Sequence, residues 1–185
     1  MTGTSSTDRL LTGEEFLALG DIGPCELIDG RIVPMSPTGG EHGAIESLIT
    51  ARLLVFVEER KLGWVLGGEV GLYTRRNPDR VRGADVAFVS RGRMPRRPGR
   101  KFMEIAPELI VEVLSPEDRQ KDLQQKLAEY FAIRVDRVWV VDPEDRSVIV
   151  YRSESDRQRL EEGDRVRGEG VLEGFELPVA SLFAA

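Results

Sequence analysis

The stretch Glu108-Leu-Ile-Val-Glu-Val-Leu114 is an apolar, partly β-branched run with a single acid, Glu112, in its interior. Such a run is typical of a strand that is buried on both faces near the centre of a sheet. A carboxylate in that setting is very costly unless an opposite charge or a cation compensates it. The stretch therefore predicts a central strand and, at Glu112, a group that needs a positive partner.

A second acid stands in the same unusual setting. Asp85 lies within Gly83-Ala-Asp-Val-Ala-Phe-Val89, another apolar run of strand type. Mg²⁺ is bound by one or two carboxylates together with water and substrate phosphate oxygens, so two acids on neighbouring strands suffice for a metal site. The alternative is that Asp85 and Glu112 form structural ion pairs, for example with Arg82, or lie at exposed strand ends.

The surrounding segments alternate between helix and strand patterns. Apolar residues recur at helical spacing over 40–61 and 118–133, and Thr12 begins a capping box for a short helix over 12–19. The turn dipeptide Asp29-Gly30 predicts a β-hairpin over 26–33. Further strand patterns lie over 64–73, 84–89, 137–141, 147–152 and 157–161, the last two as a solvent-facing hairpin before an apolar anchor over 179–183.

Together these patterns predict an α/β chain. We expect a central mixed β-sheet flanked by helices, with a strand-helix-strand crossover over 108–141 and with N-terminal and C-terminal β-hairpins. A chain of 185 residues with 41% hydrophobic content has the size of one compact domain, so a single domain over 1–185 is expected.

The composition also limits the class of protein. No apolar run is long enough to span a membrane, and the N-terminus lacks the basic and apolar pattern of a secretion signal. Cys25 is the only cysteine, so an intrachain disulfide and a cysteine-based zinc site are excluded. A reducing cytoplasm is therefore the expected location, and no membrane partner is expected.

Positive charge is concentrated in one segment of an otherwise acidic chain. The chain carries 26 basic and 32 acidic residues, a formal charge of -6, but basic residues dominate between positions 75 and 101. Phosphate neutralisation by such residues is the main source of affinity for nucleic acid. The alternative is a solvated arginine-rich loop without a ligand. The candidates for contact with nucleic acid are Arg75, Arg76, Arg82, Arg96 and Arg97.

Five motifs along the chain resemble those of a known family. In order, they are Glu26-Leu-Ile-Asp-Gly30, Arg82-Gly-Ala-Asp-Val86, Pro107-Glu-Leu-Ile-Val-Glu-Val-Leu-Ser-Pro116, Lys126-Leu-Ala-Glu-Tyr130 and Trp139-Val-Val-Asp-Pro143. This order is similar to that of the Uma-two family, which is classed with restriction endonucleases. The resemblance runs over about residues 16–151 and implies a PD-(D/E)XK nuclease core, a restriction-endonuclease-like fold in which acids on adjacent strands bind metal.

The resemblance assigns the metal-binding positions to Asp85 and Glu112, with two departures from the superfamily pattern. Ala84 stands where a proline precedes the aspartate, and Leu114 stands where the lysine of the ExK motif is expected. Residues two apart on a strand share a face, which is how that lysine would reach a metal-activated water. Because Leu114 cannot act in this way, another lysine must substitute or activity is lost.

The helix that follows offers two lysines. At about 100° per residue, Lys126 borders the apolar face of the helix, whereas Lys121 points away from it. Lys126 also precedes Tyr130 by one turn, as in the family motif. Lys126 is therefore the expected catalytic lysine, unless it only forms a helix-surface pair with Asp122.

Two further residues match family positions. Glu26 begins the first hairpin and is expected to reach the metal or a metal-bound water through a neighbour, or else to be an ordinary strand-end acid. His42 is the only histidine and lies near the start of the helix over 40–61. It is expected to contact phosphate or to assist proton transfer, unless its role is structural.

These features predict a metal-dependent nuclease whose partner is nucleic acid, with DNA expected. In this hypothesis Asp85, Glu112 and the Val113 carbonyl bind Mg²⁺ or Mn²⁺, and Lys126 orients the attacking water. By analogy with small nucleases, a homodimer is expected. Two alternatives stay open: an inactive nuclease fold that binds DNA, suggested by Leu114, and an interaction protein, suggested by the net negative charge.

Overall fold

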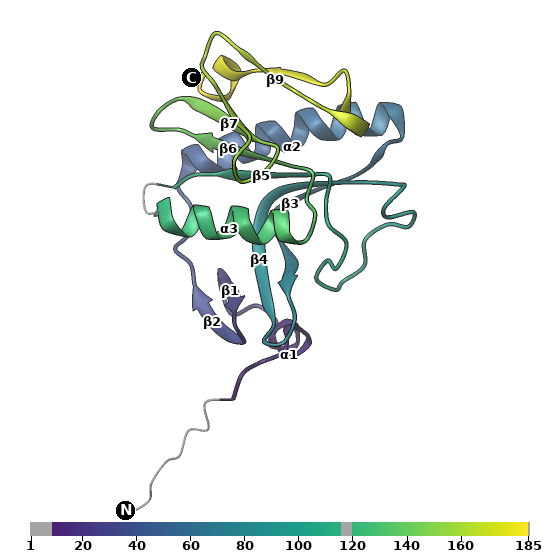
Figure 1. The fold of residues 1–185 in the computed structure, drawn as a ribbon, viewed down its shortest axis with the longest axis vertical. Helices are drawn as coiled ribbons and strands as arrows, with labels where there is room; N and C mark the ends of the chain where they lie inside the picture. The colour runs from purple at the N-terminus through teal and green to yellow at the C-terminus, as the bar shows by residue number, and fades with distance from the viewer. Residues whose placement is uncertain (1–8, 116–119, 185) are drawn as a thin grey trace, which may run out of the picture.

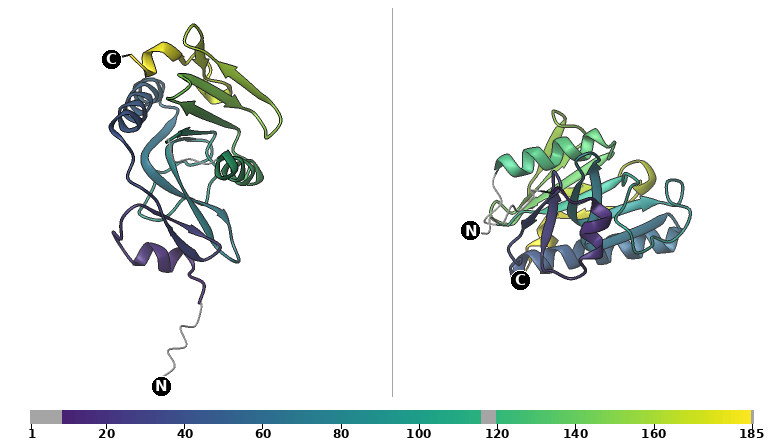
Figure 2. Two further views of the ribbon diagram at one scale, coloured as in Figure 1. Left: turned by 90° about the vertical axis from the view of Figure 1, so that its left-hand side faces the viewer. Right: turned by 90° about the horizontal axis from the view of Figure 1, so that it is seen from below.

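The structure, a computed structural model, describes residues 9–115 and 120–184. Its centre is an eight-stranded sheet, with α2 (Gly40–Arg60) and α3 (Gln120–Ala132) on opposite sides (Figures 1 and 2). The strand order is β2-β1-β4-β5-β6-β7-β8, and β3 pairs with β4 off this path. The mixed α/β architecture predicted from the sequence is confirmed.

The predicted central strand lies inside the sheet. β5 (Leu109–Val113) is flanked by β4 (Arg80–Ser90), which runs antiparallel to it, and by β6 (Arg137–Asp142), which runs parallel. The chain passes from β5 to β6 by way of α3, which is the predicted crossover. The helix was expected over 118–133, and its residues 118 and 119 lie outside the described residues.

Side chains of β5 alternate between two hydrophobic cores. The odd-numbered residues of the strand join the core beneath α2, whereas Ile110 joins the core beneath α3. Because successive residues of a strand point to opposite faces, this alternation directs Glu112 toward α3. The alternation of side chains along β5 therefore explains both why its apolar residues fill two cores and why Glu112 points toward α3.

The N-terminal part forms one end of the molecule, at the bottom of Figure 1. β1 (Cys25–Ile28) and β2 (Arg31–Pro34) form the predicted hairpin, whose turn residues Asp29 and Gly30 have φ of 54° and 75°. The predicted capping box at Thr12 begins α1 (Gly13–Ala18). These elements enclose a small core that includes Phe16 and Tyr73.

The longest strand pair joins this end to the rest of the sheet. β3 (Gly63–Arg75) runs antiparallel to β4, and the register between them shifts between Gly67 and Val70 and again near Arg75. The first shift is a bulge next to the cleft described below, a common position for such irregularities.

The C-terminal part lies beside α2 at the other end of the molecule, at the top of Figure 1. β7 (Ser147–Tyr151) and β8 (Arg157–Leu160) form the expected hairpin, but β7 is buried instead of solvent-facing because both cores extend to it. Next come the two-stranded sheet of β9 (Arg165–Arg167) and β10 (Glu176–Pro178) and the 3₁₀ helices η1 (Gly170–Leu172) and η2 (Val179–Leu182). The predicted apolar anchor lies in η2, packed into the core of α2. None of the described helices is long and apolar enough to cross a membrane.

Candidate active site

A cleft of about 270 Å³ opens where β4 and β5 pass between α2 and α3. Val113 lines it, as do Gly83 and the segment after β2. Residues of both helices and of four strands, β2 to β5, therefore meet at one place. The ionisable side chains that line it are His42, Glu69, Asp85, Glu112, Asp122 and Lys126.

Glu112 is buried in this cleft and receives hydrogen bonds from α3. The hydroxyl of Tyr130 donates to Oε1 at 2.7 Å, and the ammonium of Lys126 donates to Oε2 at 2.9 Å. The two donors lie one helical turn apart, on the face of α3 that packs toward β5. The acid inside the apolar run is thus compensated by the helix opposite it.

Lys126 lies between two acids of the cleft. Its Nζ is 2.9 Å from Oε2 of Glu112 and 3.7 Å from Oε1 of Glu26. Leu114, in the position of the ExK lysine, instead packs against the core beneath α3. Among the residues that the structure describes, the ammonium pairs with Glu112 and Glu26 and not with Asp122. Lys126 therefore reaches Glu112 from α3, although position 114 on the strand side carries no lysine.

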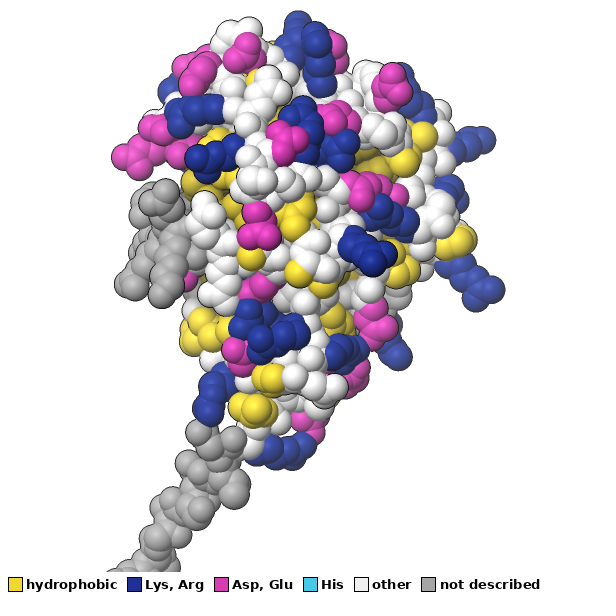
Figure 3. All heavy atoms as spheres, viewed as in Figure 1, with side chains coloured by type: hydrophobic (Ala, Val, Ile, Leu, Met, Phe, Trp, Pro, Cys, Tyr) yellow, Lys and Arg dark blue, Asp and Glu magenta, His cyan; other side chains and the backbone are white. Residues whose placement is uncertain are grey.

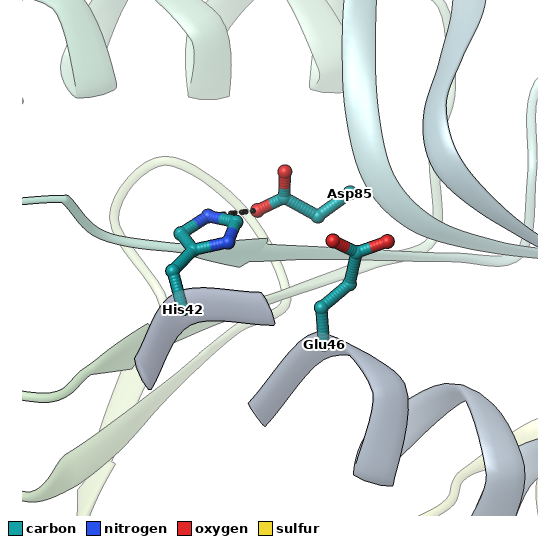
Figure 4. A group of neighbouring side chains, drawn as sticks. All are labelled: His42, Glu46 and Asp85. Atoms are coloured by element: carbon teal, nitrogen blue, oxygen red, sulfur yellow. Dashed lines mark ion pairs between the residues drawn. The ribbon is translucent and has the colours of Figure 1, made fainter. Parts of the chain in front are cut away.

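Asp85 is held between β5 and α2. Its Oδ2 accepts a hydrogen bond from the Val113 backbone N–H at 2.7 Å and lies 3.3 Å from Nε2 of His42. The hydrogen bond with Asp85 raises the pKa of His42, and burial opposes this effect. The second oxygen of Asp85 points away from His42 (Figure 4). Asp85 is therefore oriented by two donors on one oxygen.

Glu26 is buried and held by Arg82. Oε2 accepts a hydrogen bond from Nη1 of Arg82 at 2.7 Å, and Oε1 accepts one from the Gly83 N–H at 3.0 Å. The other side of the guanidinium makes a two-point contact with Glu129, at 2.7 and 2.8 Å. Arg82 is only 7% exposed. The guanidinium N–H groups of Arg82 are thus hydrogen-bonded to carboxylates inside the protein.

Sequence reasoning did not single out two acids that adjoin the cleft. Glu46 lies one helical turn after His42 on α2, and this spacing could have indicated that the two share a face. Glu69 lies in the bulge of β3, where Gly68 and Glu69 have φ of 81° and 56°. Only the Gly67-Gly68 pair marks that bulge in the sequence.

Negative charge is in excess in the cleft. Burial raises the pKa of Glu112 to about 7, the nearby charge of Asp85 adds to this, and Lys126 and Tyr130 oppose it. Burial also raises the pKa of Glu69. Although burial favours the neutral amine, Glu112 and Glu26 hold the pKa of Lys126 well above its usual range.

The donor set of the cleft fits a divalent cation. A cation stabilises carboxylates whose charged form is disfavoured by burial and by one another. Asp85 and Glu112 supply carboxylate oxygens, and Val113 also lines the cleft. Mg²⁺ and Mn²⁺ take ligands of this oxygen-rich kind.

Comparison with known proteins identifies the family. The sequence matches, over residues 14–180, the profile of a family named Uma2 and described as "Putative restriction endonuclease". The chain belongs to the Uma2 family. The resemblance found in the five sequence motifs is therefore confirmed, and it extends almost to the C-terminus.

A solved structure is similar to this Uma2 protein throughout. It is a crystal structure from Anabaena variabilis, titled as that of a "putative nuclease belonging to DUF820", with 24% sequence identity and a TM-score of 0.79. The alignment covers 94% of this chain and 97% of the other. At this identity the likeness concerns the fold. No curated protein matches the chain.

The arginines considered for contact with nucleic acid do not form one patch in this Uma2 protein. Arg75 and Arg76 lie at the turn between β3 and β4 and are paired with acids, while Arg82 is buried. Arg96 and Arg97 are exposed in the loop beyond the other end of β4. On the face seen in Figure 3, basic and acidic side chains are intermixed. β4 thus separates the arginines at the β3–β4 turn from those in the loop after β4.

Proposed function

We propose that this Uma2 protein is a metal-dependent endonuclease that hydrolyses phosphodiester bonds of nucleic acid, with DNA as the expected substrate. The observation that carries the proposal is the 2.9 Å contact between the ammonium of Lys126 and the carboxylate of Glu112, in a cleft that Asp85 also lines. Cation ligands and a positive group beside them are what this hydrolysis requires. Membership of the family supports the same class of activity.

Asp85, Glu112 and the Val113 carbonyl are the proposed ligands of Mg²⁺ or Mn²⁺. When bound, such a cation polarises the phosphate and lowers the pKa of an attacking water. The protein orients both carboxylates in advance, Glu112 through Tyr130 and Asp85 through the Val113 N–H. Hydrogen bonds of this kind fix ligand geometry and are as much a part of a metal site as the ligands.

Lys126 is the proposed partner of the attacking water or of the negative charge that develops on the phosphate. The two flanking acids keep its ammonium protonated, so it acts as a charged donor. Glu26 is a positioning residue in this scheme, because it lies 3.7 Å from Lys126 and is itself held by Arg82. His42 is assigned to the orientation of Asp85.

The proposal is tested by cleavage of plasmid DNA and of labelled DNA and RNA oligonucleotides with Mg²⁺, with Mn²⁺ and with EDTA. We expect cleavage by the wild type with either metal and none with EDTA, and loss of cleavage in Asp85→Asn and in Glu112→Gln. Glu58→Gln is the matched control, since Glu58 is exposed at the far end of α2. Cleavage that persists in EDTA or in both cleft variants would overturn the metal mechanism.

The same experiment separates the two alternative functions. Salt-sensitive binding of DNA without cleavage in either metal would indicate a nuclease fold that only binds DNA. Absence of binding even at low salt would favour an interaction protein. Cleavage of the RNA oligonucleotides alone would retain the mechanism and change the substrate.

A further inference from the structure

A second group of potential ligands lies on the α2 side of Asp85. His42 and Glu46 come from successive turns of α2 and face Asp85 of β4 (Figure 4). Each of the three residues offers one nitrogen or oxygen atom, and these atoms lie within 4.8 Å of one another. Ligand atoms around one ion lie at most about 4.4 Å apart, given bonds of about 2.0–2.2 Å. The three residues are therefore close enough together to be candidate ligands of one cation.

The imidazole of His42 has a ring nitrogen that the protein leaves unsatisfied. His42 is 7% exposed, and its Nδ1 has no hydrogen-bond partner among the described residues. Its other nitrogen, Nε2, faces Asp85, so Nδ1 lies on the side of the ring toward Glu46 (Figure 4). Buried polar nitrogens are nearly always partnered, and an orphan one needs an explanation. A cation between His42 and Glu46 supplies the missing partner.

Glu46 is anchored in a way that suits a ligand. Its Oε1 accepts a hydrogen bond from the Gly68 N–H at 2.9 Å. That donor is available because β3 bulges at this point, with Gly68 at φ of 81°. The bond fixes the carboxylate, one oxygen of which lies within 4.8 Å of the candidate ligand atoms of His42 and Asp85. An irregular strand thus orients an acid on a neighbouring helix.

We propose that His42, Glu46 and Asp85 form a second cation site, with Asp85 shared between it and the site at Glu112. An imidazole among the ligands favours a first-row transition-metal ion over Mg²⁺, which prefers oxygen ligands throughout. Two cations that share a carboxylate can act on the attacking and leaving oxygens of one phosphate. That catalytic role rests on the proposed function, whereas the binding itself does not.

Binding of Mn²⁺ tests the site without reference to catalysis. Free Mn²⁺ is measured by its electron paramagnetic resonance signal in titrations of the wild type, Glu46→Gln, Glu112→Gln and Glu58→Gln. We expect the wild type and the exposed control Glu58→Gln to bind a second ion that Glu46→Gln binds at least about tenfold more weakly, the scale of a lost metal contact. Unchanged binding in Glu46→Gln would overturn the proposal.

The single histidine provides a second test that needs no variant. Because His42 is the only histidine, a tag-free, isotope-labelled chain gives one set of imidazole signals in NMR spectra. We expect Zn²⁺ to shift the Nδ1 signal, and Mg²⁺ at the same concentration to leave it in place. An Nδ1 signal that does not shift when Zn²⁺ is added would contradict the proposed site. Zn²⁺ binding at His42 in a protein that cleaves no nucleic acid would refute the proposed function alone.

Discussion

Glu112 illustrates how a buried acid is tolerated at the level of one residue. Its Oε1 accepts a hydrogen bond from Tyr130 and its Oε2 accepts one from Lys126, both on α3. Charge-assisted bonds of this type are stronger than neutral ones, and they offset part of the cost of burial. The remaining cost appears in the raised pKa of Glu112. The residue is therefore prepared for a cation that would stabilise its charge.

Lys126→Met removes the ammonium and keeps an unbranched side chain. We expect single-turnover cleavage to slow by about 10²- to 10³-fold with little change in affinity for nucleic acid, because the lost charge acts at the reacting centre. Lys61→Met is the matched control, since Lys61 is exposed at the end of α2. A single-turnover rate equal to that of the control would remove Lys126 from the mechanism.

The raised pKa of Glu112 predicts how stability without metal depends on pH. The folded protein holds this proton more tightly than the unfolded chain, with a pKa of about 7 against 4.5. The resulting stabilisation is complete below about pH 4.5 and is lost as pH rises through about 7. Glu112→Gln stays neutral, so we expect it to lose less stability than the wild type across this range.

Urea unfolding in EDTA at about pH 4.5 and about pH 8 measures this difference, with Glu58→Gln as the control for the removal of an exposed carboxylate. Equal losses of unfolding free energy in the wild type and in Glu112→Gln would contradict the prediction.

At the level of elements, two features assemble the cleft. α3 presents Lys126 and Tyr130 to β5 because its apolar face packs on that strand. The bulge in β3 between Gly67 and Val70 interrupts the pairing with β4 and turns the Gly68 N–H toward Glu46 on α2. A helix face and an irregular strand therefore position groups on opposite sides of the acid pair.

Gly68→Ala tests the contribution of the bulge. A φ of 81° is rarely adopted by residues with a side chain, so we expect a loss of about 1–2 kcal/mol in the free energy of unfolding and weaker Mn²⁺ binding. Gly99→Ala is the control, since a Cβ there meets no atom within 4 Å and its φ is not in the left-handed range. Urea unfolding and Mn²⁺ titration measure the two effects. If Gly68→Ala and Gly99→Ala have the same free energy of unfolding and the same Mn²⁺ affinity, the bulge tolerates a side chain.

At the level of the whole molecule, the distribution of charge decides how a polyanion could bind. The chain is acidic, and pairing with acids partly neutralises Arg75 and Arg76. No carboxylate among the described residues pairs with Arg96 or Arg97. The exposed loop after β4 is therefore the part of the basic segment most available to phosphates.

Charge removal in this loop should weaken binding of nucleic acid more than the same change at the β3–β4 turn. We expect Arg96→Gln with Arg97→Gln to lower DNA affinity several-fold and to reduce the salt dependence, because released counterions scale with phosphate contacts. Arg75→Gln with Arg76→Gln is the matched comparison. Fluorescence anisotropy at two salt concentrations measures both pairs, and a larger effect at the turn would contradict the prediction.

The expected homodimer stays a prediction about the whole molecule. It follows from analogy with nucleases that use two sites on two strands. Sedimentation equilibrium across a range of protein concentrations measures the mass directly. A monomer at every concentration, with and without DNA, would contradict it.

Most of the helices and strands, and the two acids, were readable from the amino-acid sequence. The central strand, the Asp29-Gly30 turn, the capping box at Thr12 and the helix periods were readable because they depend on residues a few positions apart. Asp85 and Glu112 stood out for the same local reason, as charges inside apolar runs. Burial of β7 was not readable, since it depends on which elements cover both faces of the strand.

The groups that surround those acids are set by contacts between elements that are distant in the sequence. Lys126 reaches Glu112 because α3 packs over β5, and Arg82 is buried because Glu26, 56 residues away in sequence, lies beside it. The packing of α2 brings Glu46 beside Asp85, and the bulge in β3 places Glu69 in the lining of the cleft. Long-range packing sets these distances, and no local pattern records it. The apolar sequence around Glu112 predicts that this acid needs a positive partner. The packing of α3 on β5 makes Lys126 that partner.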